Sequence, residues 1–214
     1  MVEEFDYETG RLLDVLDELK LSENTLVIYT ADNGPWNQDK YTLKKKGHPE
    51  GSIFWGDAGP LRNGKGSPYE GGYRLPCIVR WPGKVPAGRS SDAVFATIDF
   101  LPTFARLCGF EAPRDRRIDG IDQTDLLMGK TETGRKTFYF DRAGIRFGKW
   151  KYLRAKAHFY GYAREDDRPE AEELYNLKKD IGECENLAEK HPDLVAKLRK
   201  LTEEMPQDGP GGIH

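Results

Sequence analysis

The feature that most constrains the fold is a run of apolar and β-branched residues at positions 25–30, TLVIYT, without polar–apolar alternation. Such a run is typical of a strand covered on both faces, as in a parallel sheet. An amphipathic helix is predicted before it, because Phe5, Leu12, Leu16 and Leu19 recur at helical spacing within residues 1–20. Helix, short turn and buried strand together predict an α/β fold.

Two polar side chains, Asp32 and Asn33, follow this predicted strand directly. Open α/β sheets place their ligand sites at the carboxyl ends of strands. A carboxylate beside an amide carbonyl offers the hard oxygen ligands that Ca²⁺ or Mg²⁺ prefers. An Asp-Asn-Gly sequence is also a common turn. The residues alone leave both interpretations open.

A glycine-rich stretch at 59–72, GPLRNGKGSPYEGG, contains a candidate anion ligand, Lys65. Exposed amides and an ammonium group can together hold a tetrahedral oxyanion such as sulfate or phosphate. The stretch is not a P-loop, because GxxxxGK[ST] is absent. His48, in the long preceding loop, is a candidate for the rim of a substrate site. For both side chains the alternative is a solvated position in a loop.

The rest of the chain divides near residue 135. A second buried strand is predicted at 76–81 and a helix at 98–107. After residue 135, short alternating runs at 137–140, 144–147, 150–153 and 173–177 predict an antiparallel sheet with one wet face, followed by an amphipathic helix at 192–205. We therefore expect an α/β domain at 1–135, an antiparallel-sheet and helix subdomain at 136–205, and a frayed tail at 206–214.

Composition excludes several classes of protein. The 33 basic residues against 36 acidic ones give a net charge of −3, which argues against a nucleic-acid or anionic-membrane binder. No apolar run approaches the roughly 18 residues of a membrane span. The three cysteines show no CxxC spacing and are expected to be small buried side chains rather than zinc or disulfide ligands.

Taken in order, these pieces resemble the type I sulfatases, most closely the arylsulfatase A-like subgroup. The resemblance covers essentially the whole chain, and the segments that carry it are TADNGP at 30–35, GPLRNGKG at 59–66, YEGG at 69–72, RLP at 74–76, WPG at 81–83, DFLPT at 99–103, DG at 119–120, ELYNL at 173–177 and ENL at 185–187. It implies an alkaline-phosphatase-like α/β fold, present here in part, with a small C-terminal subdomain of antiparallel sheet and helix.

The resemblance also implies roles for individual residues. Asp32 and Asn33 would ligate a Ca²⁺ that also holds the sulfate ester, and Lys65 would contact the sulfate oxygens as a catalytic and substrate-binding residue. The expected function is that of a sulfuric ester hydrolase acting on an aryl or glycan sulfate. Related phosphatases and phosphodiesterases typically carry Asp-His at this position, so the pair favours sulfate esters. A phosphodiesterase or phosphonate-ester hydrolase of the same superfamily is the alternative.

The sequence departs from the family in several respects: besides the nucleophile, the earlier pair of metal-binding aspartates, the arginine that supports the nucleophile, and an upstream lysine and histidine have no match. Family enzymes attack sulfur with a formylglycine made from the Cys or Ser of a C/S-x-P-x-R motif, and residues 1–214 contain no such motif. We therefore expect the chain to be a C-terminal piece without turnover alone, its partner being a missing N-terminal fragment. A non-catalytic truncated product is the second alternative. Family members are usually periplasmic, secreted or lysosomal, and this chain carries no address of its own.

Overall fold

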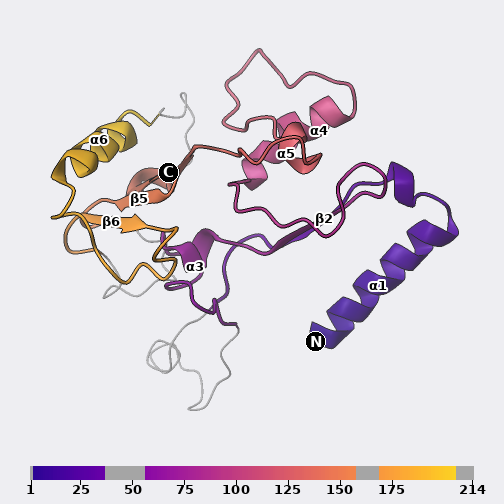
Figure 1. The fold of residues 1–214 in the computed structure, drawn as a ribbon, viewed down its shortest axis with the longest axis horizontal. Helices are drawn as coiled ribbons and strands as arrows, with labels where there is room; N and C mark the ends of the chain where they lie inside the picture. The colour runs from indigo at the N-terminus through magenta and orange to yellow at the C-terminus, as the bar shows by residue number, and fades with distance from the viewer. Residues whose placement is uncertain (1, 37–55, 158–168, 206–214) are drawn as a thin grey trace. The chain divides into compact units, whose positions relative to one another are not determined.

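The computed structural model describes residues 2–36, 56–157 and 169–205 (Figure 1). Its contacts group the chain into two units, one formed by residues 1–30 and 76–135, the other by residues 31–75 and 136–214. The segment that carries Asp32, Asn33 and Lys65 thus groups with the C-terminal residues. The domain boundaries expected from the sequence remain predictions, and the two units are described separately.

The described residues of the first unit form a two-stranded sheet and several helical segments. Its elements are α1 (Val2–Glu18), η1 (Ser22–Asn24), β1 (Val27–Thr30), β2 (Cys77–Arg80), η2 (Thr97–Asp99), α4 (Phe100–Leu107) and α5 (Thr124–Leu127). The predicted N-terminal helix is confirmed as α1. Its acidic first turn, Glu3 and Glu4, suits the positive end of the helix dipole.

The predicted parallel, fully covered arrangement of the first two strands is wrong for the pair that the structure describes. β1 and β2 run antiparallel, with Val27 opposite Arg80 and Thr30 opposite Cys77. Their residues are half-buried or exposed rather than buried. An unbroken apolar run indicates that both faces of a strand can pack against other elements. It contains no information on the direction of the neighbouring strand.

Asp99 organises the helical part of this unit. Its buried carboxylate accepts hydrogen bonds from the backbone N–H groups of Ala96 and Ile121, at 3.0 and 2.9 Å, and pairs with the guanidinium of Arg135. Two segments that are distant in sequence, at Ile121 and Arg135, are thereby tied to the start of α4. A buried carboxylate with several donors is stable in the charged form.

The second unit is built on a four-stranded antiparallel sheet, which confirms the predicted C-terminal sheet and helix. The strands lie in the order β3-β4-β5-β6. The elements are α3 (Glu70–Tyr73), β3 (Thr137–Tyr139), η3 (Asp141–Ala143), β4 (Gly144–Phe147), β5 (Trp150–Leu153), β6 (Glu173–Asn176) and α6 (Pro192–Glu203).

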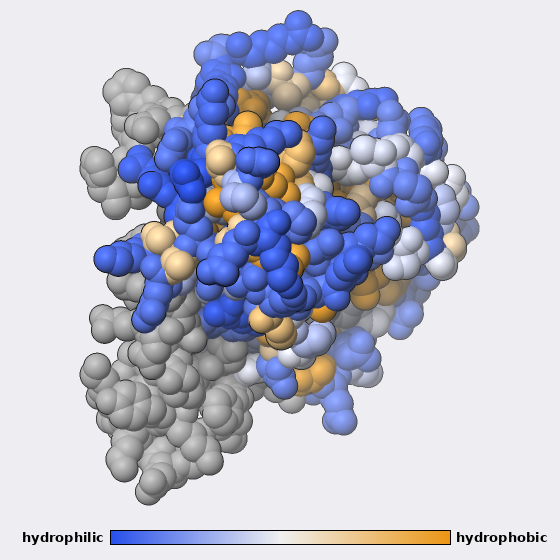
Figure 2. All heavy atoms as spheres, turned by 60° about the vertical axis from the view of Figure 1, so that its left-hand side comes forward, coloured by the Kyte–Doolittle hydropathy of each residue, from blue (hydrophilic) through white to orange (hydrophobic). Residues whose placement is uncertain are grey.

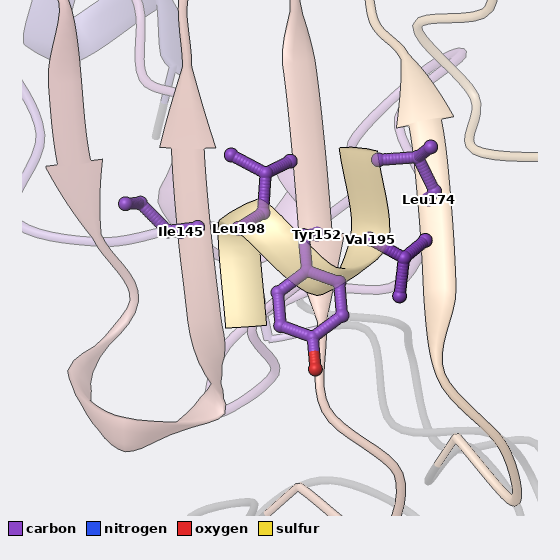
Figure 3. Packing of buried hydrophobic residues seen from close by; sticks show 5 residues of the cluster. All are labelled: Ile145, Tyr152, Leu174, Val195 and Leu198. Atoms are coloured by element: carbon purple, nitrogen blue, oxygen red, sulfur yellow. The ribbon is translucent and has the colours of Figure 1, made fainter. Parts of the chain in front are cut away.

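One face of this sheet packs against α6. Ile145, Tyr152 and Leu174 lie opposite one another on neighbouring strands, so their side chains leave the same face. Val195 and Leu198 of α6 pack against them in one buried cluster (Figure 3). Leu198 is fully buried, and burying a side chain of this size contributes about 1.5–3 kcal/mol.

The opposite face, expected to be wet, is also covered. Tyr69 packs there against Leu153, Tyr175 and Leu177 in a second buried cluster. Tyr69 belongs to the glycine-rich stretch that carries Lys65. The prediction that this face is exposed to water is therefore wrong. An alternating strand pattern shows that one face is more polar, but not whether water or a polar loop lies against it.

The face of the molecule that Figure 2 shows is mainly hydrophilic among the described residues. In Figure 2 hydrophilic side chains predominate and hydrophobic ones gather in small patches, as expected for a sequence with 32% charged residues. No helix among the described residues is long and apolar enough to span a membrane. Cys77, Cys108 and Cys184 are free and exposed, which corrects the expectation of buried cysteines.

Candidate functional site

Asp32 and Asn33 lie in the turn that immediately follows β1. Asp32 is exposed and Asn33 is half-buried. One carboxylate oxygen of Asp32 accepts a hydrogen bond from the Asn33 backbone N–H at 2.9 Å. This local bond is what a simple Asp-Asn turn would form. It also engages one carboxylate oxygen and leaves the second oxygen and the Asn33 amide oxygen as hard donors.

Two backbone hydrogen bonds connect this turn to the glycine-rich stretch. The Gly34 N–H donates to Gly72 O, and the Lys65 N–H donates to Pro35 O, both at 2.9 Å. The approach is close, because a Cβ on Gly34 would lie 1.8 Å from Gly71 O. The structure thus brings the backbone of Lys65 beside the Asp32–Asn33 turn, although some 30 residues separate them. We call Gly34, Gly71, Gly72 and these bonds the glycine frame.

The loop around Lys65 is folded on itself. The Gly71 N–H donates to Arg62 O at 2.9 Å, and a Cβ on Gly71 would lie 2.1 Å from Asn63 O. The half-buried Lys65 therefore projects from a loop whose two ends meet. Its Nζ lies 5.8 Å from the centroid of the Trp36 ring, within cation–π range.

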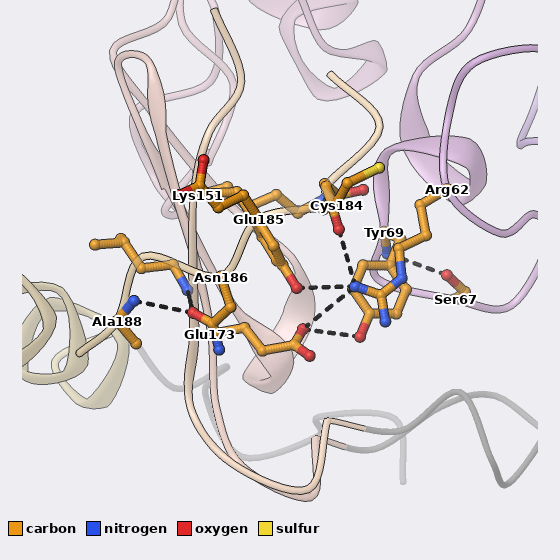
Figure 4. A network of polar contacts seen from close by, with 12 residues as sticks. Arg62, Ser67, Tyr69, Lys151, Glu173, Cys184, Glu185, Asn186 and Ala188 are labelled. Atoms are coloured by element: carbon orange, nitrogen blue, oxygen red, sulfur yellow. Dashed lines mark hydrogen bonds and ion pairs between the residues drawn. The ribbon is translucent and has the colours of Figure 1, made fainter. Parts of the chain in front are cut away.

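Arg62 and Tyr69 fix this loop to the C-terminal sheet. The Arg62 guanidinium lies 3.8 Å from the centroid of the Tyr69 ring and donates to the Tyr175 hydroxyl at 2.8 Å. The Tyr69 hydroxyl donates to Glu173 at 2.8 Å (Figure 4). Burial and the nearby Glu173 charge raise the pKa of the Tyr69 hydroxyl. That hydroxyl is therefore a permanent donor at neutral pH.

Glu70 adds a buried ion cluster. The ammonium of Lys151 lies 2.9 Å from a carboxylate oxygen of Glu70 and 2.9 Å from one of Glu183, and all three side chains are buried. Burial opposes ionisation of Glu70, but Lys151 and nearby arginines outweigh it and lower the pKa. Burial raises the pKa of Glu183 despite its contact with Lys151. We call Glu70, Lys151 and Glu183 the ion cluster.

Sequence reasoning missed these supporting residues. Glu70 and Lys151 are charged residues that ordinarily face water, and no local pattern marks them as buried. The sequence did single out Asp32, Asn33 and Lys65, whose segments are brought together. His48 lies outside the described residues, so its predicted role at a substrate rim remains a prediction.

The donor set fits a calcium ion in kind but is small. Asp32 and Asn33 supply hard oxygen donors, whereas Ca²⁺ takes about six to eight. Within the described parts of the chain, no three His, Cys, Asp or Glu side chains gather closely enough to hold a metal. Any calcium held here would therefore need further ligands.

Comparison with known proteins identifies the class. The sulfatase family model matches residues 1–110, and the model of the C-terminal region of N-sulphoglucosamine sulphohydrolase matches residues 64–208. The chain therefore belongs to the sulfatase family, as the motifs predicted.

Individual relatives agree with this assignment. The chain is 33% identical to an N-acetylgalactosamine-6-O-sulfatase of Bacteroides thetaiotaomicron, over 94% of this chain and 40% of the relative. It is 30% identical to human arylsulfatase G, over 96% of this chain and 42% of the relative. It is 42% identical to mouse steryl-sulfatase, over 65% of this chain and 21% of the relative.

Solved structures share the fold. A structure from work on glycosaminoglycan metabolism by Bacteroides thetaiotaomicron matches with TM-score 0.75 and 33% identity, over 94% of this chain and 42% of that one. A protein crystallised with its substrate D-glucosamine-2-N,6-O-disulfate matches with TM-score 0.65 and 29% identity, over 95% of this chain and 38% of that one. The neighbours confirm an alkaline-phosphatase-like α/β fold, present in part. Although 94% of this chain is matched in each case, the chain spans only about 40% of the length of the Bacteroides relative and of the first solved structure.

Proposed function

We propose that this chain supplies one side of the active site of a sulfuric ester hydrolase that acts on a sulfated glycan or aryl sulfate. The glycine frame carries the proposal, because it holds the backbone of Lys65 against the Asp32–Asn33 turn through two hydrogen bonds of 2.9 Å. Relatives named as glycan sulfatases, and a related protein crystallised with a disulfated glucosamine, support a sulfated sugar as the substrate.

The proposed role of Lys65 follows from charge. A sulfate ester carries negative charge on its non-bridging oxygens, and more charge reaches the leaving oxygen as its bond to sulfur breaks. An ammonium group held at a fixed position stabilises such charge more than mobile solvent does. The glycine frame provides the fixed position, since it constrains the backbone on both sides of Lys65.

Asp32 and Asn33 are proposed as calcium ligands. A bound Ca²⁺ would supply Lewis-acid polarisation of the sulfate oxygens. With two protein ligands, the chain alone should bind calcium weakly, with a Kd of about 1 mM or above. Titration of the isotope-labelled chain with CaCl₂ should shift the Asn33 and Gly34 amide resonances, and Asp32→Ala should abolish those shifts. If CaCl₂ shifts these resonances in Asp32→Ala as much as in the parent chain, Asp32 is not a calcium ligand.

The nucleophile is proposed to come from a further polypeptide segment with a C/S-x-P-x-R motif. α1 has no buried residue, and its side chains Phe5, Tyr7 and Leu12 are each more than 60% exposed. Uncovered apolar side chains of this number suit a further protein surface. The chain alone is accordingly expected to show no turnover of 4-nitrophenyl sulfate.

A chimera tests the proposed function. The corresponding part of the Bacteroides thetaiotaomicron N-acetylgalactosamine-6-O-sulfatase would be replaced by this chain, keeping the preceding part of that enzyme. We expect turnover of 4-nitrophenyl sulfate, reduced about 100-fold or more by Lys65→Ala, in line with the loss of one oxyanion-stabilising group. The exposed Lys84→Ala is the matched control and should leave turnover unchanged.

The same chimera separates sulfate from phosphate chemistry. Faster hydrolysis of 4-nitrophenyl phosphate than of the sulfate would favour the phosphodiesterase or phosphonate-ester alternative. Sulfate turnover that is insensitive to Lys65→Ala would overturn the assignment of Lys65.

A further inference from the structure

The most unusual group in the second unit is the ammonium of Lys151. Its side chain is fully buried in the middle of the sheet, on β5, and its Nζ also lies 4.2 Å from the centroid of the Phe140 ring. Lysine is almost never fully buried unless it is paired. Here it is paired twice, at 2.9 Å from each of two carboxylates.

The geometry of the sheet places Lys151 on the face that meets the lysine-bearing loop. Arg146 and Tyr175 lie opposite Lys151 on the two neighbouring strands, so all three side chains leave the same face. Arg146 adds an ion pair of 3.6 Å to Glu70. Tyr175 accepts the hydrogen bond from Arg62 at the start of the loop. Each of the three strand positions therefore contacts residues 62–72.

The ion cluster reaches the glycine frame through the main chain. Glu183 accepts a hydrogen bond from the Glu70 backbone N–H at 2.6 Å, so Lys151 holds Glu70 both directly and through Glu183. Glu70 is followed at once by Gly71 and Gly72, which bond to Arg62 O and to the Gly34 N–H. A displacement of Glu70 would thus be transmitted to both ends of the frame.

We propose that Lys151 is a positioning residue for the sulfate-contacting lysine: by pairing with both Glu70 and Glu183 beneath the loop, it fixes the glycine frame and hence Lys65. The assignment of sulfate to Lys65 rests on the proposed function, whereas the hold of Lys151 on the frame does not. The C-terminal sheet is then more than a stable appendage, because it sets the geometry of a site located on a distant part of the sequence.

Hydrogen–deuterium exchange on the 214-residue chain tests this directly. In Lys151→Met, the Gly34, Lys65 and Gly71 amides should exchange at least about tenfold faster, because the bonds that protect them depend on the position of Glu70. The α6 amides of Val195 and Leu198, on the other face of the sheet, should change by less than about threefold. Lys149→Met, at an exposed position two residues away, is the matched control and should change neither set.

A second variant guards against loss of folding. Lys151→Met removes the cation beside Glu183 and leaves Glu70 with only the more distant guanidinium groups of Arg146 and Arg74, which is unfavourable. The triple variant Lys151→Met/Glu70→Gln/Glu183→Gln removes all three charges and keeps the side-chain lengths. It should fold with a protected α6 and still show fast exchange at Gly34, Lys65 and Gly71. Equal acceleration in α6 and the frame, or no acceleration in the frame, would overturn the positioning role.

Turnover in the chimera separates the two proposals. We expect Lys151→Met to lower kcat for 4-nitrophenyl sulfate by about tenfold or more, with KM changed less than about threefold. A displaced Lys65 ammonium would stabilise the transition state less, while its effect on substrate binding would be smaller. A tenfold rise in KM at constant kcat would contradict positioning. If the parent chimera has no turnover while the frame loosens in Lys151→Met, the proposed function fails and the hold of Lys151 on the frame is retained.

Discussion

The substitution Gly34→Ala tests the glycine frame with the smallest possible change. A Cβ on Gly34 would lie 1.8 Å from Gly71 O and 2.9 Å from the Gly72 Cα, so it meets main chain that no side-chain rotation can move. The two segments must separate, and the bond from the Gly34 N–H to Gly72 O is lost. Overpacking costs about 1–3 kcal/mol and the hydrogen bond about 0.5–1.5 kcal/mol, against about 0.4–1 kcal/mol gained from a stiffer unfolded chain.

The expected net destabilisation is about 2 kcal/mol, which for a chain of this length lowers the melting temperature by roughly 4–8 °C. Thermal melts followed by circular dichroism measure it. Gly10→Ala is the control, since Gly10 lies within α1 with no atom near the added Cβ, and it should raise stability by about 0.5–1 kcal/mol. A melting temperature of Gly34→Ala within 1 °C of the parent would refute the close approach of the two segments.

Three further outcomes follow from the packing and the charges. Leu198→Ala should cost about 2–5 kcal/mol through the cavity left between α6 and the sheet, whereas the exposed Lys200→Ala should be neutral in the same denaturant titration. Tyr69→Phe, which removes the donor to Glu173, should cost about 1–3 kcal/mol. Burial opposes ionisation of Asp99, but Arg135 and two backbone amides lower its pKa below the ordinary 3.8. Its stabilisation is therefore present above that pH and is lost as pH falls through the lowered value, so Asp99→Asn should flatten the decline in melting temperature below about pH 4.

The spacing of apolar residues along the sequence correctly predicted the N-terminal helix and the C-terminal sheet. The helix at the N-terminus follows from apolar residues at helical spacing, and α1 spans Val2–Glu18. The C-terminal sheet follows from alternation, and four antiparallel strands occur there. The direction of the β1–β2 pair did not follow, because one strand's composition does not specify its neighbour. The second covered face of the sheet did not follow either, since its cover is a polar, glycine-rich loop.

The candidate site divides in the same way. Asp32, Asn33 and Lys65 were recognisable because their chemistry suits ligands and their surroundings are rich in glycine. Lys151 and Glu183 were not, because their importance comes from burial, and burial of a charge depends on partners distant in sequence. A search for glycine-rich loops therefore finds the group that would contact a substrate but not the groups that hold it.

The glycine-rich stretch combines two kinds of position, and its spacing explains why both are needed. Arg62 lies before Lys65, and Tyr69 and Glu70 lie after it, each bonded to residues of the C-terminal sheet or of the segment that follows it. Only glycine fits at Gly71, where the two arms of the loop meet. Anchors on both sides convert a flexible segment into a rigid support, because a loop fixed at two close points has few conformations left. The charge cannot be moved one residue along the stretch without strain, because Gly66 has a φ of 88°, in the left-handed region that favours glycine. The position of Lys65 between the two anchors is therefore set by the backbone on its C-terminal side as well as by the anchors.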